Sequence, residues 1–383
     1  MKKICFYTES VFDLGGIQRV VTDLANNLCE DYDITILCTH LVPEDKKVNY
    51  NLNENIKVDY LPKTLLIFRF YNFIFMIIRF LYRDLFKLSK KRDCFALINY
   101  KSRLNILKSL EKYVNDNNFD YIVAEGLNCS IYLSLVKNNV HKKTCFIGCW
   151  HSSFDRYTKE YPDKLVSFSL KTNDKTIVLS KNDKKLIKQF YKVNTICIYN
   201  PINRLDNKCT SQENKFIAVG RYNKIKGYDK LITSFYLFNK TNKNWKLEII
   251  GDGEERENLQ KLIDKYNLNN YIKLTGKTNN IGKYYNSAKV FLMTSKFEGL
   301  PMVLLEAMQH KLPIITTDIP IVHEILPSKV PIVPQNDVAL YAKIMENVVT
   351  NKDNINSMVD EYDEFLELFY IDTIVNKWKS IFK

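Results

Sequence analysis

The sequence lacks several features that would place it in common classes of protein. Its nine cysteines form no CxxC pair, and such an odd, scattered set is typical of reduced thiols in a cytoplasmic protein. No GxGxxG follows the first strand-like segment, KICFYT, which argues against a nicotinamide-dependent Rossmann enzyme. The N-terminal segment MKKICFYTES has the two lysines of a secretory signal but only a short apolar stretch. We therefore expect no cleaved leader and a cytoplasmic location.

Length and composition indicate a globular protein of more than one domain. At about 150 residues per domain, a chain of 383 residues predicts two domains, or three. Because 46% of the residues are hydrophobic and 13% are aromatic, the chain can bury large cores, which excludes global disorder. The net charge of +13 suits nucleic acid, an anionic membrane or a phosphorylated small molecule as partner. The alternative is a Lys-rich and Asn-rich composition spread over solvated faces.

Short apolar segments alternate with amphipathic helical segments almost throughout the chain. We expect strands at 3–8, 33–39, 119–125, 144–150, 175–180, 215–220, 245–251, 271–276, 289–295, 312–317 and 330–333. A helix is expected between Gly16 and Glu30. Continuous apolar strands that alternate with helices predict an α/β fold with parallel sheets covered on both faces. In such doubly wound domains ligands bind at the carboxyl ends of the strands.

The polar stretch NPINRLDNKCTSQENK separates the two series of strands and resembles a linker between domains. We predict an N-terminal domain at 1–199, a linker at 200–214 and a C-terminal domain at 215–360. A final helical segment at 361–383 is expected to pack back on the N-terminal domain.

The segment 64–92, TLLIFRFYNFIFMIIRFLYRDLFKLSKKR, interrupts the alternation. Its apolar run contains Arg69 and Arg79 at mid-depth, so we exclude a transmembrane span. On a helix of about 100° per residue, one narrow stripe collects Arg69, Asn72, Arg79, Arg83, Lys87 and Lys90. A basic stripe on an apolar helix suits the interface of an anionic membrane, and we expect attachment to the inner face of the cell membrane. The alternative is a core helix whose polar stripe faces water.

The stretch FEGLPMVLLEAM, 297–308, places Glu298 in a loop and Glu306 inside a helix. Pro301 is expected in the first helical turn, and the unpaired N–H groups of a helix start form an anion site. Taken alone, Glu298 has an ordinary explanation as a capping acid, and Glu306 as a solvated residue.

Two segments at the ends of strands favour a functional role for these glutamates over the ordinary explanations. GRYNKIKGYDKLI, 220–232, places Arg221 and Lys226 after a strand, where a doubly wound domain would hold a diphosphate. GDGEERENL, 251–259, occupies the corresponding position after the next strand.

In this order, GRYNKIKGYDKLI, IIGDGEERENLQKLI and FEGLPMVLLEAM resemble the retaining glycosyltransferases of family 4, which have the GT-B fold. FDLGGIQRVVTDLANNL resembles the Gly-Gly loop of that family, and YNPI resembles its turn into the second domain. The resemblance covers most of the chain except 64–118. It implies an acceptor-binding first domain and a nucleotide-sugar-binding second domain. The implied reaction transfers a sugar, with retention, from a nucleotide diphosphate, expected to be UDP, to a saccharide or lipid-linked saccharide in cell-surface polysaccharide synthesis.

The resemblance also implies roles for single residues. Glu298 would hydrogen-bond hydroxyls of the donor sugar, and Glu306 would accept from the ribose hydroxyls. His151, at a strand end in IGCWHSSF, would contact the donor sugar and assist catalysis. The alternative for His151 is a structural histidine with satisfied hydrogen bonds.

For the rest of the donor, the resemblance implies a cluster of cations and backbone amides. The diphosphate would be bound by Arg221, Lys226, Gly16, Leu300, Met302 and Val303, and the base by Lys277 and Thr278. The two cations and the helix start would supply the positive potential that a divalent ion gives elsewhere. We therefore expect no metal, and no cofactor besides the nucleotide-sugar substrate.

Two rival functions stay open. A sugar-nucleotide epimerase of the same architecture would bind a UDP-sugar but would need no acceptor. A non-enzymatic binder of membrane or nucleic acid would not saturate with UDP. Its nucleic-acid form is disfavoured, because the basic residues outside 64–92 are dispersed and not interleaved with aromatic residues.

Overall fold

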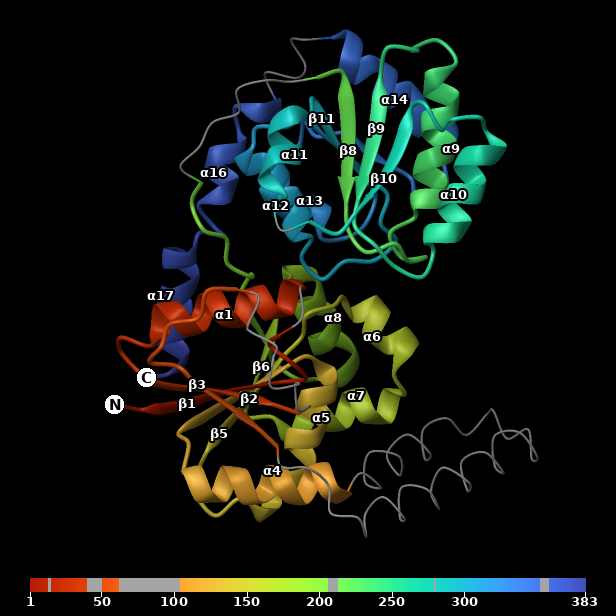
Figure 1. Cartoon of the computed structure of the whole chain (residues 1–383). Coiled ribbons are helices and arrows are strands. Elements are labelled where there is room, and N and C mark those ends of the chain that lie inside the picture. The colour runs from red at the N-terminus through yellow and green to blue at the C-terminus, as the bar shows by residue number, and fades with distance from the viewer. Residues whose placement is uncertain (13–14, 40–49, 62–103, 206–212, 279, 352–357) are drawn as a thin grey trace, which may run out of the picture. The chain divides into compact units, whose positions relative to one another are not determined.

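The computed structural model describes residues 1–12, 15–39, 50–61, 104–205, 213–278, 280–351 and 358–383. The chain forms two compact units (Figure 1): the first joins Met1–Pro201 with Ile374–Lys383, and the second is Ile202–Thr373. The segment 64–92, with its expected basic stripe, lies outside the described residues. Within the described ranges, no helix is long and apolar enough to cross a membrane.

The first unit is built on a seven-stranded sheet of order β3-β2-β1-β4-β5-β6-β7. Its strands are β1 (Lys3–Thr8), β2 (Asp33–Cys38), β3 (Lys57–Tyr60), β4 (Tyr121–Glu125), β5 (Cys145–Cys149), β6 (Lys175–Val178) and β7 (Ile196–Cys197). All neighbouring strands pair in parallel. The five strands expected in this half are present because their residues are almost all buried, as helix-covered parallel strands require.

Helices lie between these strands along the chain. Those in the described residues are α1 (Gly16–Leu28), α4 (Leu104–Asn117), α5 (Leu127–Val136), the short 3₁₀ turn η3 (Lys137–Asn139), α6 (Phe154–Glu160), α7 (Asp163–Thr172) and α8 (Lys181–Tyr191). The C-terminal helix α17 (Ile371–Ile381) belongs to this unit from Ile374 on. The end of α17 is tied to the sheet, since Lys2 Nζ donates to the carbonyl of Phe382 at 2.9 Å and Lys175 Nζ donates to that of Ile381 at 3.0 Å.

The second unit is built on a six-stranded parallel sheet of order β10-β9-β8-β11-β12-β13. Its strands are β8 (Lys215–Val219), β9 (Lys246–Ile250), β10 (Ile272–Gly276), β11 (Val290–Met293), β12 (Ile314–Thr317) and β13 (Ile332–Val333). Its helices are α9 (Tyr228–Asn239), α10 (Arg256–Lys265), α11 (Gly282–Ser287), α12 (Met302–Gln309), α13 (Val322–Ile325), α14 (Val338–Thr350) and α16 (Tyr362–Leu366). All six strands expected in this half are present, and the expected α/β class with two doubly wound parallel sheets is confirmed.

Aromatic side chains dominate the core of the second unit. The ring of Phe216 on β8 lies 4.6 Å from that of Trp245 and 5.1 Å from that of Phe238, centroid to centroid. In this sheet the chain order reverses between β8 and β11, which are hydrogen-bonded neighbours. The loops that leave these two strands therefore start side by side at the carboxyl edge, the position where doubly wound sheets bind ligands.

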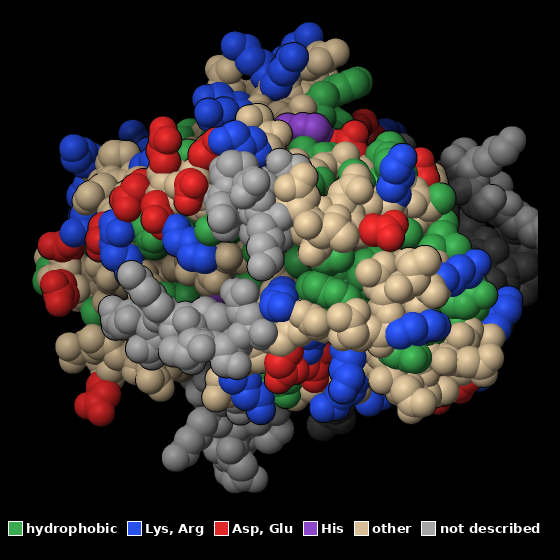
Figure 2. Space-filling view, turned by 90° about the horizontal axis from the view of Figure 1, so that it is seen from above, with side chains coloured by type: hydrophobic (Ala, Val, Ile, Leu, Met, Phe, Trp, Pro, Cys, Tyr) green, Lys and Arg blue, Asp and Glu red, His purple; other side chains and the backbone are tan. Residues whose placement is uncertain are grey.

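The surface charge is dispersed on the face seen in Figure 2. Lys and Arg side chains are spread over that face with Asp and Glu side chains between them. On that face the basic residues are therefore interspersed with acidic ones on a solvated surface.

Candidate functional site

In the second unit, the loop after β8 is shaped by its own short polar side chain. Asn223 Oδ1 accepts hydrogen bonds from the backbone amides of Ile225 and Lys226, each at 3.1 Å, a turn that Asn forms readily. Gly227 follows with φ +65°, and a Cβ there would lie 2.3 Å from the carbonyl oxygen of Thr294. Only glycine therefore lets the start of α9 approach the end of β11 so closely.

This turn directs Lys226 toward Glu298. Lys226 Nζ lies 2.7 Å from Glu298 Oε1, with the two side chains 19% and 15% exposed. The loops are joined further, because Thr294 Oγ1 donates to the carbonyl of Lys226 at 2.9 Å. Two of the expected donor-site residues thus meet in a partly buried ion pair, where a cation and a hydrogen-bond acceptor are held within one ligand's reach.

Helix α12 begins at Met302, so Pro301 takes the N-cap position and not the expected place in the first turn. The reason is its backbone, whose ψ of 88° lies outside the helical range. Leu300 is buried at 7% exposure, so only its backbone is suited to contact a ligand. Met302 and Val303 carry amide groups of the first turn, which have no acceptor within the helix.

Glu306, one turn into α12, is held by a buried phenol. Tyr285 Oη donates to Glu306 Oε2 at 2.8 Å. The Tyr285 ring stacks on His310 at 4.9 Å and on Phe291 at 5.9 Å, and burial lowers the pKa of His310 below its ordinary value of 6.5. Tyr285 was not among the expected site residues, because nothing in its short helix, GKYYNS, indicates that its hydroxyl bonds an acid 21 residues further along the chain.

Arg221 extends in another direction. Its side chain is 72% exposed, and Nη2 lies 3.2 Å from Glu254 Oε2 in the loop after β9. That loop requires its glycines: Gly251 has φ +146°, and a Cβ there would lie 2.0 Å from the carbonyl oxygen of Gly220. An exposed pair of this kind contributes little to stability, so Arg221 is free to take another anionic partner.

The two residues expected near the base follow the edge strand β10, two strands away from β8. Lys277 is exposed and Thr278 is half-buried, with its Oγ1 accepting from the amide of Asn280 at 3.1 Å. In the first unit, Gly16 begins α1 and is exposed, and a Cβ there would meet no described atom within 4 Å. Among the described residues there is thus open space at Gly16, which is what close approach of a ligand needs.

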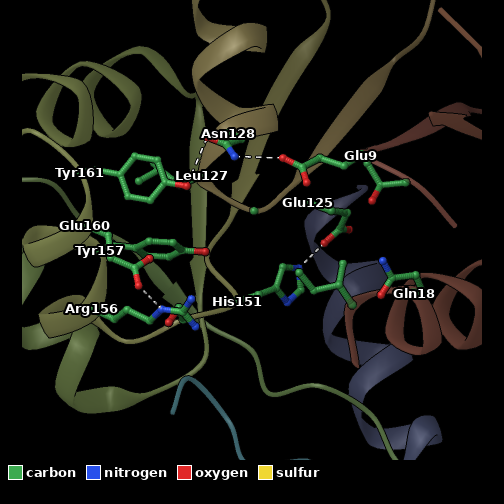
Figure 3. Close-up of a pocket in the computed structure, with 14 residues that line it drawn as sticks. Glu9, Gln18, Glu125, Leu127, Asn128, His151, Arg156, Tyr157, Glu160 and Tyr161 are labelled. Atoms are coloured by element: carbon green, nitrogen blue, oxygen red, sulfur yellow. Dashed lines mark hydrogen bonds and ion pairs between the residues drawn. The ribbon is translucent and has the colours of Figure 1, made fainter. Parts of the chain in front are cut away.

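His151 lies in the first unit, just after β5, beside a pocket of about 300 Å³ (Figure 3). Its Nε2 hydrogen-bonds Glu125 Oε2 at the end of β4, and the two side chains are 7% and 1% exposed. Glu125 was not among the expected site residues, although an acid that closes a buried strand, in FDYIVAE, was an available signal. The interaction gives one ring nitrogen of His151 an acidic partner, which both the catalytic role and the structural alternative allow.

Further polar side chains line the same pocket. Asn128 Nδ2 donates to Glu9 Oε1 at 2.9 Å, and Tyr161 Oη donates to Asn128 Oδ1 at 3.2 Å. Arg156 Nε donates to Glu160 Oε1 at 2.8 Å. The groups of Asn128 and Glu9, together with Tyr161, are of the types that bind sugars and other polyols. The Arg156–Glu160 pair is more exposed, with side chains 39% and 43% exposed.

Comparison with known proteins supports a specific class of enzyme. Residues 200–364 match the family model described as "Glycosyl transferases group 1". An uncharacterized glycosyltransferase of Haemophilus influenzae is 27% identical over 390 residues, with 100% of both chains covered. The amylovoran biosynthesis glycosyltransferase AmsD of Erwinia amylovora is 31% identical over 230 residues, which cover 57% of this chain and 65% of AmsD.

Solved structures agree with this assignment of the fold. A mutant of S. aureus TarM, in complex with fondaparinux, alpha-GlcNAc-glycerol and UDP, superposes with a TM-score of 0.79 at 15% identity and 100% coverage of both chains. Sucrose-phosphate synthase of Thermosynechococcus elongatus gives a TM-score of 0.78 at 15% identity, with 100% of this chain and 98% of that chain covered. The fold is GT-B. Together with the sequence matches, it supports a glycosyltransferase.

Proposed function

We propose that the protein is a retaining glycosyltransferase that moves a sugar from a nucleotide diphosphate, with UDP as the nucleotide, to a saccharide or lipid-linked saccharide in polysaccharide or glycolipid synthesis. The observation that carries this proposal is the ion pair of Lys226 and Glu298 at 2.7 Å. It joins the two motifs of the resemblance, one after β8 and the other after β11, at the ligand-binding edge of one sheet.

In this proposal the second unit binds the donor. Lys226 and Arg221 neutralise the diphosphate, and the first amides of α12, at Met302 and Val303 with the backbone of Leu300, donate to it. Lys226 then leaves Glu298 for the phosphate, so that Glu298 accepts from hydroxyls of the donor sugar. Glu306 accepts from the ribose hydroxyls, with Tyr285 holding its other side.

The remaining donor contacts are proposed from the resemblance. Lys277 and Thr278 would lie beside the base, and Gly16 would admit the phosphates because a side chain is absent there. His151, at the pocket of the first unit, would contact the donor sugar. The first unit would bind the acceptor.

Retention follows from same-face attack. The bond between the anomeric carbon and the diphosphate oxygen breaks while the acceptor oxygen bonds to that carbon, and the acceptor's proton passes to the leaving phosphate. The cations and helix start stabilise the charge that develops on the diphosphate, so the proposal needs no metal ion. Residues 64–92 would hold the enzyme at the inner face of the cell membrane, close to a lipid-linked acceptor.

Two of the similar proteins support the choice of substrates. The S. aureus TarM structure holds UDP, and AmsD is named for amylovoran biosynthesis. Calorimetry with UDP-, GDP- and ADP-sugars tests the donor: a UDP-sugar should bind more tightly than UMP and the other two classes. If no nucleotide sugar binds more tightly than its bare nucleoside monophosphate, the donor assignment is wrong. Product formed from the donor alone, without acceptor, would indicate an epimerase.

A further inference from the structure

Glu125 and His151 are placed by the backbone of two neighbouring strands. Glu125 pairs with Cys149 in the parallel ladder of β4 and β5. Beyond the strands, the amide of Gly126 donates to the carbonyl of Cys149 at 2.9 Å, and the amide of Trp150 donates to that of Ile177 at 2.9 Å. The sheet therefore sets the positions of both side chains before any ligand binds.

Among the described residues, the Glu125 carboxylate has one hydrogen-bond partner. Its side chain is 1% exposed and its Oε2 bonds His151 Nε2, while Oε1 is buried without a hydrogen-bond partner among the described residues. A buried carboxylate without full compensation is costly. Such a group is retained at a site where its charge is used.

The same interaction selects one nitrogen of the imidazole. When Glu125 is ionised it only accepts hydrogen bonds, and Nε2 then carries the hydrogen. Nδ1 is buried and has no partner in the described part of the chain. Nδ1 is thus the ring atom left for a polar group of a ligand.

The chain beside His151 is packed on the opposite side. The ring of Tyr157 meets Trp150, the residue before His151, edge-on at 5.0 Å. Figure 3 shows His151 with Glu125 on one side and Tyr157 on the other, at the pocket that all three line. The imidazole is therefore held by Glu125, in a chain segment that is itself packed through Trp150.

We propose that Glu125 is a positioning residue for His151: it holds the imidazole through Nε2 so that Nδ1 meets the transferred sugar. The inference rests on the proposed function only for the identity of the ligand as the transferred sugar. The tautomer of the imidazole that Glu125 selects does not depend on the proposed function. In a neutral ring Nδ1 accepts from a sugar hydroxyl, and in a charged ring it donates to a sugar oxygen.

The test compares three substitutions in the full-length protein. Glu125→Met keeps the side chain's length and removes the acceptor, Glu125→Gln keeps an acceptor but removes the charge, and Glu160→Gln is the matched control. Glu160 lines the same pocket and pairs with Arg156. The first measurement is ¹⁵N NMR of histidine-labelled protein, in which the His151 signal is assigned among five histidines by its loss in His151→Gln.

We expect His151 of the wild type, and of Glu160→Gln, to carry its hydrogen on Nε2, and Glu125→Met to show a mixture of tautomers. In the transfer assay, Glu125→Met should lower kcat by about 10- to 100-fold, as loss of an orienting partner does, with a smaller change in the donor KM and in the thermal midpoint. Glu125→Gln should retain more of kcat than Glu125→Met.

Three results would overturn the inference. The first is a wild-type His151 protonated only on Nδ1, and the second is a Glu125→Met variant with unchanged tautomer and kcat. A fall in kcat that merely follows a fall in thermal midpoint would assign Glu125 a structural role and also reject the proposal. If no nucleotide sugar is a donor, the proposed function fails, and the NMR measurement still decides whether Glu125 positions His151.

Discussion

Lys226 and Glu298, which are 72 residues apart in the chain, form an ion pair of 2.7 Å at the ends of neighbouring strands. In the absence of a ligand, Glu298 pairs with Lys226, the cation that the proposed diphosphate would bind. The pair thus holds the lysine in place with its charge partly neutralised. Donor binding exchanges one anionic partner of Lys226 for another.

This exchange predicts opposite effects of the two substitutions on UDP binding. Lys226→Met should weaken UDP by about 10- to 100-fold, since hydrogen bonds to charged groups contribute about 1.5–3 kcal/mol. Glu298→Gln should leave UDP affinity unchanged or raise it, because Lys226 loses a competing anion, yet lower kcat by about 100-fold. Calorimetry with UDP and steady-state rates measure the two quantities.

Lys224→Met is the matched control, because Lys224 is an exposed lysine of the same loop. It should change UDP affinity by less than about threefold, the range expected for a solvated charge. A loss of UDP affinity in Glu298→Gln as large as that in Lys226→Met would contradict the proposed exchange.

The Glu306–Tyr285 hydrogen bond leads to a second prediction, about the ribose. If Glu306 accepts from ribose hydroxyls, the wild type should bind UDP about tenfold more tightly than 2′,3′-dideoxy-UDP. Glu306→Ala should abolish most of that difference. Tyr285→Phe should reduce the difference, because the Glu306 carboxylate loses the hydrogen bond that holds it. The same substitution should lower the free energy of unfolding by about 1 kcal/mol. Calorimetry with both nucleotides measures the difference. Equal discrimination in the wild type and in Glu306→Ala would show that the ribose binds elsewhere.

Much of the fold could be predicted because buried parallel strands are continuous apolar runs. β1, for example, was expected at 3–8 and spans Lys3–Thr8. β3 and β7 were not predicted, because their residues are exposed or only half-buried and the strands are short. Such edge strands owe their pairing to neighbours and not to a pattern of their own.

The candidate site was predictable only as a set of separate motifs. Residue types and spacing singled out Lys226 and Glu298, but their contact depends on β8 lying next to β11, a crossover that spacing along the chain does not encode. Glu125 and Tyr285 were not predicted. Each is buried, and its hydrogen-bond partner lies 26 residues away for Glu125 and 21 residues away for Tyr285, a contact that sequence spacing does not indicate.

A third prediction concerns pH and His310. Burial lowers the pKa of His310, so the unfolded chain takes up a proton near pH 6.5 while the folded chain does so only at lower pH. His310 therefore contributes full stability above pH 6.5, and that contribution is lost as pH falls through the folded value. In His310→Gln this part of the pH dependence should disappear, so the wild type should lose more stability than the variant between pH 7.5 and 5.5. Urea unfolding midpoints at both values measure it, and parallel losses would contradict the assignment.

The last prediction separates a glycine needed for folding from one needed for binding. At Gly251, φ is +146° and a Cβ would lie 2.0 Å from the carbonyl oxygen of Gly220, so Gly251→Ala should destabilise the protein by about 2–4 kcal/mol through strain and displaced backbone. At Gly16 a Cβ meets no atom of the described residues within 4 Å, and alanine in the first turn of α1 should leave stability unchanged or raise it by up to about 1 kcal/mol. If Gly16 admits the donor phosphates, Gly16→Ala should nevertheless raise the donor KM several-fold. Thermal unfolding and donor KM of the two variants decide: a stable Gly16→Ala protein with wild-type KM would remove Gly16 from the donor site.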